Sequence, residues 1–302
     1  MLNLTLRQLR YFDALARHRH FGHAAEACAI SQPAMSEQIK EMESGFGAPL
    51  FERNARAVRA TSLGEALALR VRGILAAIDD LEALATSHRP LRRLQLGVIP
   101  TVAPYLLPAL VRDLNAGFPD LELRVRETIT PRLVDELTQG RLDAVILALP
   151  VSGRGFETAE LFCEEFLIVR PAARAGEPAP DLDSLAHEHL LLLEEGHCLR
   201  DQALAFCGLD ALRTRDALEA SSLSTLVQMA AAGLGVTLIP EMAVAVEARS
   251  AAVDITRFRD PKPSRTIGMI WRRNSPMTKT LREVGEVVRR TARGRVMAPA
   301  ET

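Results

Sequence analysis

The sequence predicts an α/β protein in three parts: a small all-helical domain with a wing, one long helix, and two α/β lobes. Three observations predict this order. Short helical patterns follow one another from residue 5 to 47, one unbroken helical pattern runs from 62 to 87, and strand and helix patterns alternate from residue 94 onward. The 302 residues are enough for two or three domains with their own cores.

We place the domain boundaries at the changes between these patterns. The winged domain takes residues 1–61, the long helix 62–90 and the lobes 91–302. Within the last part, one lobe is expected to consist of 91–163 and 266–302, and the other of 164–265.

Three short helices are predicted at the N-terminal end. Apolar residues recur at helical spacing from Thr5, a second helix covers 22–28, and a third begins at Gln32 behind Ser31, which is a favourable N-cap residue. Pro33 lies in the first turn, where proline is tolerated. The third helix has an inward apolar stripe of Met35, Ile39 and Met42. Two short helices joined by a tight turn have the spacing of a helix-turn-helix, whose second helix enters the major groove of DNA, although three ordinary packed helices would show the same spacing.

A hairpin that carries arginines follows the third helix. Arg53, Arg56 and Arg59 stand at three-residue spacing, which fits a wing lying over a phosphate backbone. The whole chain is almost neutral, with 37 Lys and Arg against 38 Asp and Glu. Only the regional charge therefore hints at nucleic acid, since residues 1–60 hold eight basic and six acidic side chains.

The long helix predicted from 62 to 87 has a heptad pattern. Its apolar residues step by four and three, at positions 67, 71, 74, 78, 81 and 85. A seam of this length on one helix needs a partner helix, and a second copy of the chain is the simplest partner. We therefore expect a homodimer.

The two lobes are predicted from alternating strands and helices after a short basic linker at 88–93. The first series runs through 94–99, 103–116, 122–127, 131–139 and 142–149. The second contains strands at 164–170, 189–194 and 235–240, a strand-like patch at 217–220, and helices from Cys198 and Ser222. A strand at 266–271 and a helix from Thr278 close the chain. This alternation predicts a parallel sheet, and the cleft between two such lobes is a natural ligand site.

Composition excludes several classes of protein. The longest apolar stretch, 144–151, is much shorter than the ~18 residues that a membrane-spanning helix needs, and the N-terminal segment has no secretory signal pattern. We expect a cytoplasmic protein with no membrane contact, in which four cysteines are not structural disulfides. Without a phosphate loop, a dinucleotide fingerprint or a metal-ligand cluster, we predict no cofactor and no metal.

The segment FGHAAEACAISQPAMSEQIKEMESGFGAPLFERNARAVRAT, followed by a long helix, resembles the winged helix-turn-helix and linker helix of LysR-type transcriptional regulators. The resemblance covers nearly the whole chain and includes GVIPTVAPYLLP, GRLDAVILAL and AAGLGVTLIP. It implies a two-lobed, periplasmic-binding-protein-like effector domain. It also implies double-stranded operator DNA and RNA polymerase as partners, and a homodimer that assembles into a homotetramer.

Carried over position by position, the resemblance implies a set of DNA-binding residues at the start of the recognition helix and in the wing: Ser31, Gln32, Pro33, Ser36 and Arg53. Glu37 departs from the family pattern, because many members have a basic or small residue there. An acid beside DNA phosphates is repelled unless it accepts from a cytosine amino group, so we assign Glu37 no contact.

The segment GHCLRDQALAFC resembles the two-cysteine segment of the peroxide-sensing members of this family. Cys198 follows His197 and opens a predicted helix, so the helix dipole and a neighbouring cation would both favour the nucleophilic thiolate. The thiolate attacks a peroxide oxygen, and a second thiol captures the sulfenic acid as a disulfide; Cys207 is the obvious partner. If 198–207 is helical, the two Cα atoms lie roughly 13 Å apart. A disulfide needs about 4.4 to 6.8 Å, so oxidation would have to unwind the helix.

The resemblance also implies residues around Cys198 that polarise the O–O bond and supply a proton: Thr101, Thr130, His197, Asp201 and Arg265. Three of them have a simpler interpretation. Thr101 would cap the helix after Pro100, Asp201 would favour the first turn of its own helix, and Arg265 would be a solvated surface residue.

The cysteines leave more than one function open. Without the resemblance, a Cys-x8-Cys pair is more often buried packing than a switch, and we expect Cys28 and Cys163 in the core. The leading hypothesis is a peroxide-responsive transcriptional regulator, not an enzyme, that a glutaredoxin- or thioredoxin-type thiol reductant resets. The alternatives are a LysR-type regulator that binds a small metabolite between its lobes, and a thiol peroxidase, which would have no need of residues 1–90.

Overall fold

The computed structural model describes residues 4–54, 57–85, 93–151, 153, 155–181, 185, 188–206, 218–249 and 251–296. The chain divides into two compact units. The N-terminal unit comprises Met1–Thr86 with Thr138–Arg141, and the C-terminal unit comprises Ser87–Leu137 with Leu142–Thr302.

The three short helices of the N-terminal unit are confirmed. They are α1 (Leu6–His18), α2 (Phe21–Ala27) and α3 (Gln32–Phe46). The Ser31 hydroxyl accepts the Ala34 N–H as the N-cap of α3, and the predicted stripe of Met35, Ile39 and Met42 is fully buried. α3 ends at Gly47, whose φ of +68° favours glycine.

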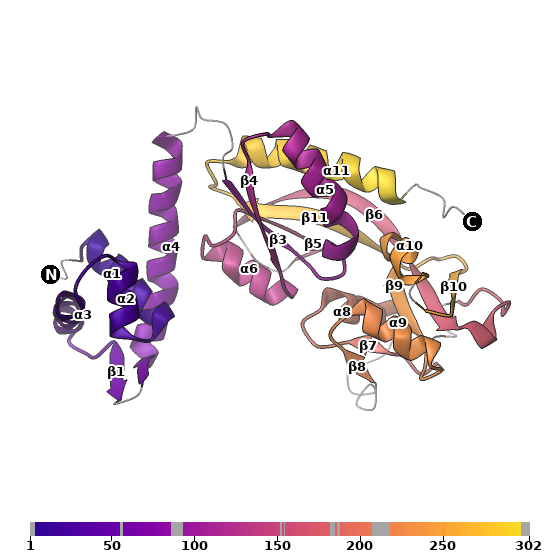
Figure 1. Ribbon diagram of the computed structural model, residues 1–302, viewed down its shortest axis with the longest axis horizontal. Coiled ribbons are helices and arrows are strands. Elements are labelled where there is room, and N and C mark those ends of the chain that lie inside the picture. Colours follow the sequence, from indigo (N-terminus) through magenta and orange to yellow (C-terminus); the bar gives the residue numbers. More distant parts are fainter. Residues whose placement is uncertain are drawn as a thin grey trace. The chain divides into compact units, whose positions relative to one another are not determined.

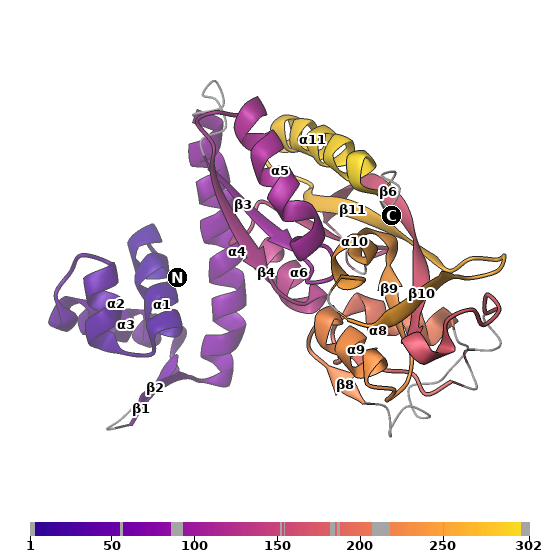
Figure 2. The ribbon, with the colours of Figure 1, turned by 45° about the vertical axis from the view of Figure 1, so that its right-hand side comes forward.

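A two-stranded wing and a long helix follow. Strands β1 (Phe51–Asn54) and β2 (Ala57–Ala60) pair antiparallel, and Figure 2 shows this hairpin projecting beyond the helices of the unit. Helix α4 runs from Ser62 to Ala85, which confirms the long helix over the described residues.

The predicted heptad seam on α4 is wrong at its first two positions, Leu67 and Val71, which do not face a partner helix. Val71 is fully buried and Leu67 packs beside it in the core that α4 shares with α1 and α3. The physical reason is that this small unit needs one apolar face of α4 to close its own core. The exposed leucines and isoleucine are Leu63, Leu69 and Ile74, with 40%, 60% and 48% of their surface exposed.

The C-terminal unit is built on a mixed sheet in the order β10-β6-β11-β5-β3-β4, with β9 paired to β6. Strands β3 (Arg93–Val98), β4 (Glu122–Glu127) and β5 (Ala144–Leu149) are parallel, as predicted. Strands β6 (Phe156–Pro171) and β11 (Ser264–Arg272) run antiparallel to their neighbours, so the prediction of a purely parallel sheet is wrong. β6 follows β5 through a short loop, which leaves no room for a crossover helix.

Helices cover both faces of the first part of this sheet (Figure 1). α5 (Ala103–Gly117) and α11 (Thr278–Val296) lie together on one face, and α6 (Thr130–Thr138) lies on the other. Gly97 in β3 allows α6 to pack closely, because a Cβ there would lie 2.8 Å from the Leu133 side chain.

The sixteen-residue strand β6 runs through both lobes. Residues 156–165 pair with β11, whereas 166–171 pair with β9 (Thr237–Pro240) and β10 (Val253–Arg257). Around the second part lie short elements: η1 (Ala172–Arg174), β7 (Leu192–Leu193), α8 (Cys198–Phe206), β8 (Glu219–Ala220), α9 (Leu223–Ala231), η3 (Glu241–Ala243) and α10 (Val244–Glu247). β6 and β11 therefore connect one lobe to the other.

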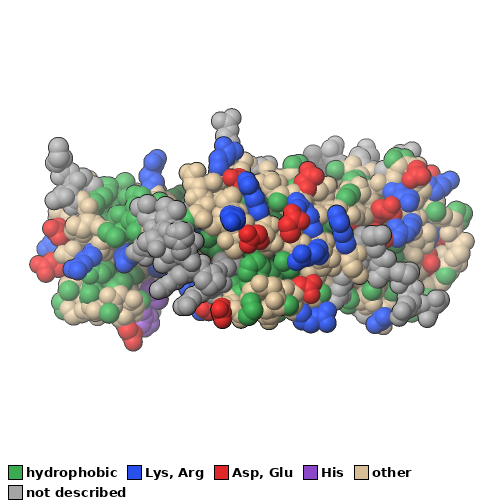
Figure 3. Space-filling model, turned by 90° about the horizontal axis from the view of Figure 1, so that it is seen from above, with side chains coloured by type: hydrophobic (Ala, Val, Ile, Leu, Met, Phe, Trp, Pro, Cys, Tyr) green, Lys and Arg blue, Asp and Glu red, His purple; other side chains and the backbone are tan. Residues whose placement is uncertain are grey.

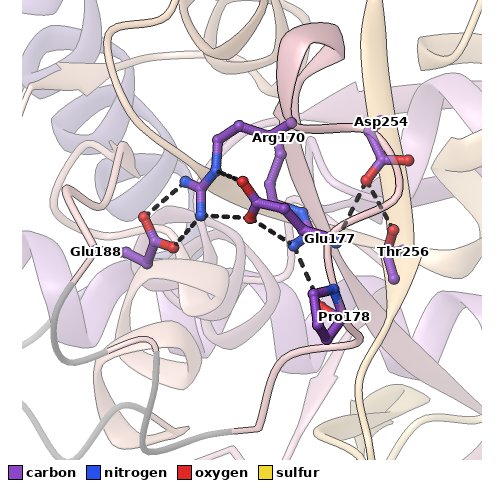
Figure 4. Close-up of polar contacts among 7 residues, drawn as sticks. Arg170, Glu177, Pro178, Glu188, Asp254 and Thr256 are labelled. Carbon is purple, nitrogen blue, oxygen red and sulfur yellow. Dashed lines mark hydrogen bonds and ion pairs between the residues drawn. The ribbon is translucent and has the colours of Figure 1, made fainter.

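A cluster of ion pairs fixes the far end of β6 (Figure 4). The Arg170 guanidinium is almost fully buried, lies 3.2 Å from Glu177 and 3.3 Å from Asp254 on β10, and donates to the Pro178 carbonyl. Arg174 lies between Glu177 and Glu188. Among the described helices, none combines the length and apolar character that crossing a membrane requires.

Candidate functional site

Cys198 is the first residue of α8, as the sequence predicts. It is half-buried and packs against the main core of the C-terminal unit. The turn before it contains Gly196, which has a φ of +93° and lies so close to Ile129 that a Cβ would come within 2.8 Å of that side chain. This close approach sets the start of α8 beside the start of α6.

Thr130 is the first residue of α6 and directly follows Ile129, the residue that lies against Gly196 in the turn before Cys198. Its hydroxyl oxygen is buried and has no hydrogen-bond partner within the described part of the chain. A buried hydroxyl without a partner is unusual, because leaving it unpaired costs about 1–3 kcal/mol. The arrangement suits a site in which a small polar molecule supplies the missing partner.

Arg265 and Thr101 are joined directly in a buried network. Arg265 Nη1 donates to Thr101 Oγ1 at 2.8 Å, and Nη2 donates to the Thr101 carbonyl at 3.1 Å. Both simpler interpretations are wrong: Arg265 is only 2% exposed, and the Thr101 side chain does not cap α5. Because a guanidinium only donates, the Thr101 hydroxyl hydrogen stays available for another acceptor.

Glu164 on β6 completes this network, and sequence analysis missed it. Its Oε1 accepts from Arg265 Nε at 3.0 Å and Nη2 at 2.9 Å, with both side chains fully buried. Its other oxygen accepts the Met242 N–H at 3.1 Å. The only signal in the sequence is a pair of acidic residues, Glu164 and Glu165, before the apolar run FLIV.

A second buried polar pair lies near Arg265. The Tyr105 hydroxyl on α5 donates to Glu247 Oε1 at 2.8 Å, and Ser224 on α9 donates to the same oxygen at 2.9 Å. Burial, and then the bond to Glu247, raise the pKa of Tyr105 far above its usual range, so this hydroxyl remains a donor. The pair links α5 of one lobe to α9 and α10 of the other.

His197 is buried, and this changes its expected role. Burial lowers the pKa of its imidazole, and the nearby Glu194 carboxylate opposes that effect only in part. The lowered pKa favours the neutral ring near pH 7, which argues against the cation expected beside Cys198. The N-terminus of α8 remains as the feature that favours a thiolate at Cys198.

The remaining predicted residues of the thiol site are less constrained. Asp201 is exposed in the first turn of α8, one turn after Cys198 and on the same side of the helix. Cys207 lies outside the described residues. Cys163 is exposed on β6, so the expectation that it lies in the core is wrong. Cys28 is half-buried at the end of α2, where burial raises its pKa.

The candidate DNA-binding residues lie at one end of α3. Gln32 and Pro33 are exposed, Ser36 is half-buried, and Ser31 uses its hydroxyl to cap the helix. Glu37 is exposed. Arg53 lies in β1 opposite Val58, and its side chain is outside those the structure describes.

His20 extends this surface, although the sequence alone did not single it out. Its Nδ1 accepts the N–H groups of Gly22 and His23 at the start of α2, at 3.1 and 3.3 Å. The ring proton must then be on Nε2, which leaves an exposed donor. Gly22 brings this turn close to Gln32.

The two units match the two family descriptions of one group of bacterial regulators. Residues 6–65 match "Bacterial regulatory helix-turn-helix protein, lysR family", and residues 87–293 match "LysR substrate binding domain". The chain belongs to the LysR family of transcriptional regulators, whose members bind operator DNA and form oligomers.

Full-length relatives share both units. The chain is 43% identical to a probable hydrogen peroxide-inducible genes activator of Streptomyces viridosporus, over 96% of this chain and 95% of the relative. It is 39% identical to the DNA-binding transcriptional dual regulator OxyR of Escherichia coli, over 95% of each chain.

Solved structures of OxyR proteins are similar as well. A full-length variant from Pseudomonas aeruginosa has a TM-score of 0.80 at 35% identity and covers 95% of both chains. A variant from Corynebacterium glutamicum with bound hydrogen peroxide has a TM-score of 0.67 at 32% identity, and covers 97% of this chain and 94% of that one.

Proposed function

We propose that this protein is a hydrogen peroxide-sensing, DNA-binding transcriptional regulator that switches through a disulfide between Cys198 and Cys207. The observation that carries the proposal is the position of Cys198. It is the first residue of α8, and Gly196 in the turn before it lies against Ile129. The next residue, Thr130, has a buried hydroxyl that finds no hydrogen-bond partner among the described residues. Full-length relatives that are named as peroxide-inducible gene activators support the same function.

The reaction oxidises two thiols and reduces one peroxide to two water molecules. The Cys198 thiolate attacks one peroxide oxygen, the O–O bond breaks as an S–O bond forms, and the departing hydroxide takes a proton to become water. The Cys207 thiol then attacks the sulfenic sulfur. The S–S bond forms, the S–O bond breaks, and the second oxygen leaves as water.

We assign the polar residues to the first step. The Thr101 hydroxyl, whose oxygen is already held by Arg265, donates its hydrogen to a peroxide oxygen, and the Thr130 hydroxyl gains the partner that it lacks. Neutral His197 and exposed Asp201 supply the path for the proton that the departing oxygen needs. Arg265 acts mainly by fixing Thr101, because Glu164 balances its charge.

The second step requires α8 to unwind. The helix is continuous from Cys198 to Phe206, which separates the Cα atoms of these two residues by roughly 12 Å. Cys207 is bonded directly to Phe206, and a disulfide needs Cα atoms about 4.4 to 6.8 Å apart. Oxidation therefore replaces an ordered helix with a different local structure, which is a two-state change that a regulator can transmit.

We assign DNA binding to the N-terminal unit. The His20 turn approaches Gln32 at the start of α3, and the Arg19 carbonyl accepts the Val58 N–H of the wing, with Arg19 and Arg59 exposed there. In contrast, Figure 3 shows basic and acidic side chains interspersed over the upper face of the C-terminal unit, with no patch of one sign. Phosphate binding favours a surface of one sign.

The partners follow from this assignment. We infer a homodimer that assembles into a homotetramer on double-stranded operator DNA, RNA polymerase as the protein it acts on, and a glutaredoxin- or thioredoxin-type reductant. The cytoplasm holds all of these. A regulator needs to react with peroxide only once per switch and without turnover, so we infer a sensor and not an enzyme.

Mass spectrometry after one equivalent of hydrogen peroxide tests the redox chemistry. We expect a cross-linked peptide pair that joins Cys198 to Cys207 and has lost two hydrogens. In Cys207→Ser, a sulfenic acid should remain at Cys198, and Cys198→Ser should lose the peroxide response but keep operator binding. Survival of both thiols in excess peroxide would contradict the proposal, and rapid turnover with a thiol reductant would instead indicate a peroxidase.

A further inference from the structure

The last residue of α8 is attached to the strand that connects the lobes. The Phe206 ring lies 5.4 Å from the Phe166 ring on β6, measured between centroids, with a tilt of 56°. Phe206 is half-buried and packs against both hydrophobic cores of the C-terminal unit. It is also the residue bonded to Cys207.

Phe166 has a fixed position in the same strand. It is 1% exposed, and the guanidinium carbon of Arg265 lies 5.4 Å from its ring centroid. Hydrogen bonds to Glu164 and Thr101 fix the position of the Arg265 guanidinium beside the Phe166 ring. A cation near an aromatic face, and two tilted rings at this separation, are both attractive arrangements.

We propose that the stack of Phe206, Phe166 and Arg265, here called the aromatic latch, holds α8 in its reduced helical form and so sets how readily the Cys198–Cys207 disulfide forms. The inference rests on the disulfide switch proposed above. A disulfide between Cys198 and Cys207 requires α8 to unwind. This unwinding moves Phe206 by several ångströms and breaks the contact between the two rings.

The latch is present only in the reduced state, which determines the direction of its effect. Removing the ring contact raises the free energy of the reduced, helical state and leaves the oxidised state unchanged. The equilibrium between dithiol and disulfide should therefore shift toward the disulfide, by roughly two- to twelvefold for one aromatic pair. The two rings of the latch, Phe206 and Phe166, take no part in the first step, the attack of Cys198 on peroxide, in which Arg265 acts only by fixing Thr101.

The test compares Phe206→Leu and Phe166→Leu with the unmodified full-length protein. Each is equilibrated in glutathione redox buffers, and the fraction of disulfide is measured after acid quench and alkylation. We expect both substitutions to shift the midpoint toward more reducing buffer by a roughly two- to twelvefold change in equilibrium constant, and the double variant to shift it by less than the sum. Leucine favours helix slightly more than phenylalanine, so helix propensity opposes the expected shift.

Phe162→Leu is the matched control. Phe162 lies four residues earlier on β6, is half-buried and packs on the same core, but within the described residues its ring stacks on no other ring. An unshifted midpoint for Phe206→Leu, or an equal shift for Phe162→Leu, would overturn the latch. If Phe166→Leu unfolds, Phe206→Leu still decides the matter because Phe206 is only half-buried.

A second readout separates the latch from the disulfide switch itself. In a Cys207→Ser background, the rate of sulfenic acid formation at Cys198 should be the same with and without Phe206→Leu. If the unmodified protein forms no disulfide at all, the proposed function fails. If it forms a disulfide but the substitutions of Phe206 and Phe166 leave the dithiol–disulfide midpoint unchanged, only the latch fails.

Discussion

At the scale of single residues, a substitution of Thr130 can show whether its hydroxyl takes part in the chemistry or only in packing. Its hydroxyl makes no hydrogen bond among the described residues, so Thr130→Val, which keeps the shape, should leave thermal stability equal or slightly higher. The same change should slow oxidation of Cys198 by roughly 10²-fold, the usual cost of one lost donor at a reacting oxygen. Peroxide consumption in stopped flow gives the rate, and a circular dichroism melt gives the stability.

Thr130→Ser is the control for that prediction, because it keeps the hydroxyl and loses only a methyl group. It should retain most of the oxidation rate. Equal rates for Thr130→Val and the unmodified protein would remove Thr130 from the chemistry and leave its unpaired hydroxyl as a feature of packing.

His197 makes folding stability depend on pH. Its folded-state pKa is lowered by burial, so the unfolded chain binds the proton more readily than the folded one. The contribution to stability is fully present above the unfolded pKa of about 6.5, and it is lost as the pH falls through the folded value. His197→Gln should therefore show a smaller fall in urea midpoint between about pH 7.5 and 5. Parallel midpoint curves for the two proteins would contradict this.

Residues whose roles depend on local sequence were predicted, and residues whose roles depend on distant contacts were not. Ser31 caps α3 because a cap needs only the next three residues. Arg265 was placed near Cys198 only through the family resemblance, because its partner Glu164 stands 101 positions earlier and only the pairing of β6 with β11 brings them together. The neutral state of His197 likewise depends on burial, which no neighbour in the sequence indicates.

At the scale of elements, helical periodicity and caps predicted nearly every helix, but strand direction was not predictable. The parallel order of β3, β4 and β5 follows from crossover helices, a local pattern. The first half of β6 was missed because its sequence, FETAEL, lacks the regular apolar and polar alternation of a strand and gains order from β11, about a hundred residues later. The antiparallel members of the sheet depend on that long-range pairing.

The ion pairs at the end of β6 give a prediction for one element. Arg170→Met keeps the buried apolar stem of the side chain and removes the charge that joins β6 to Glu177 and Asp254. We expect unfolding free energy to fall by about 1–3 kcal/mol, because hydrogen bonds to charged groups are lost at a buried position. Urea denaturation measures the change. An unchanged midpoint, or an altered redox equilibrium of Cys198, would contradict a purely structural role.

At the scale of the whole molecule, the apolar face of α4 indicates how the protein assembles. One side of the helix closes the core of its own unit through Val71, whereas Leu63 and Ile74, which lie eleven residues apart and so on nearly the same side of the helix, are exposed to solvent. Exposed large apolar residues gathered along one helix mark an interaction surface. In a family of regulators that form oligomers, a second copy of α4 is the partner of matching chemistry.

Replacing Leu63 and Ile74 together with lysine should therefore weaken the homodimer at least tenfold, since like charges would face each other across the interface. Both side chains are exposed, so the fold should survive, and oxidation of Cys198 should be unaffected. Operator affinity should fall with dimerisation, because two linked units read two half-sites. Sedimentation velocity over a concentration series measures the dimer. Leu6→Lys, the same replacement at an exposed leucine of α1, is the control, and an unchanged dimer in the α4 variant would place the interface elsewhere.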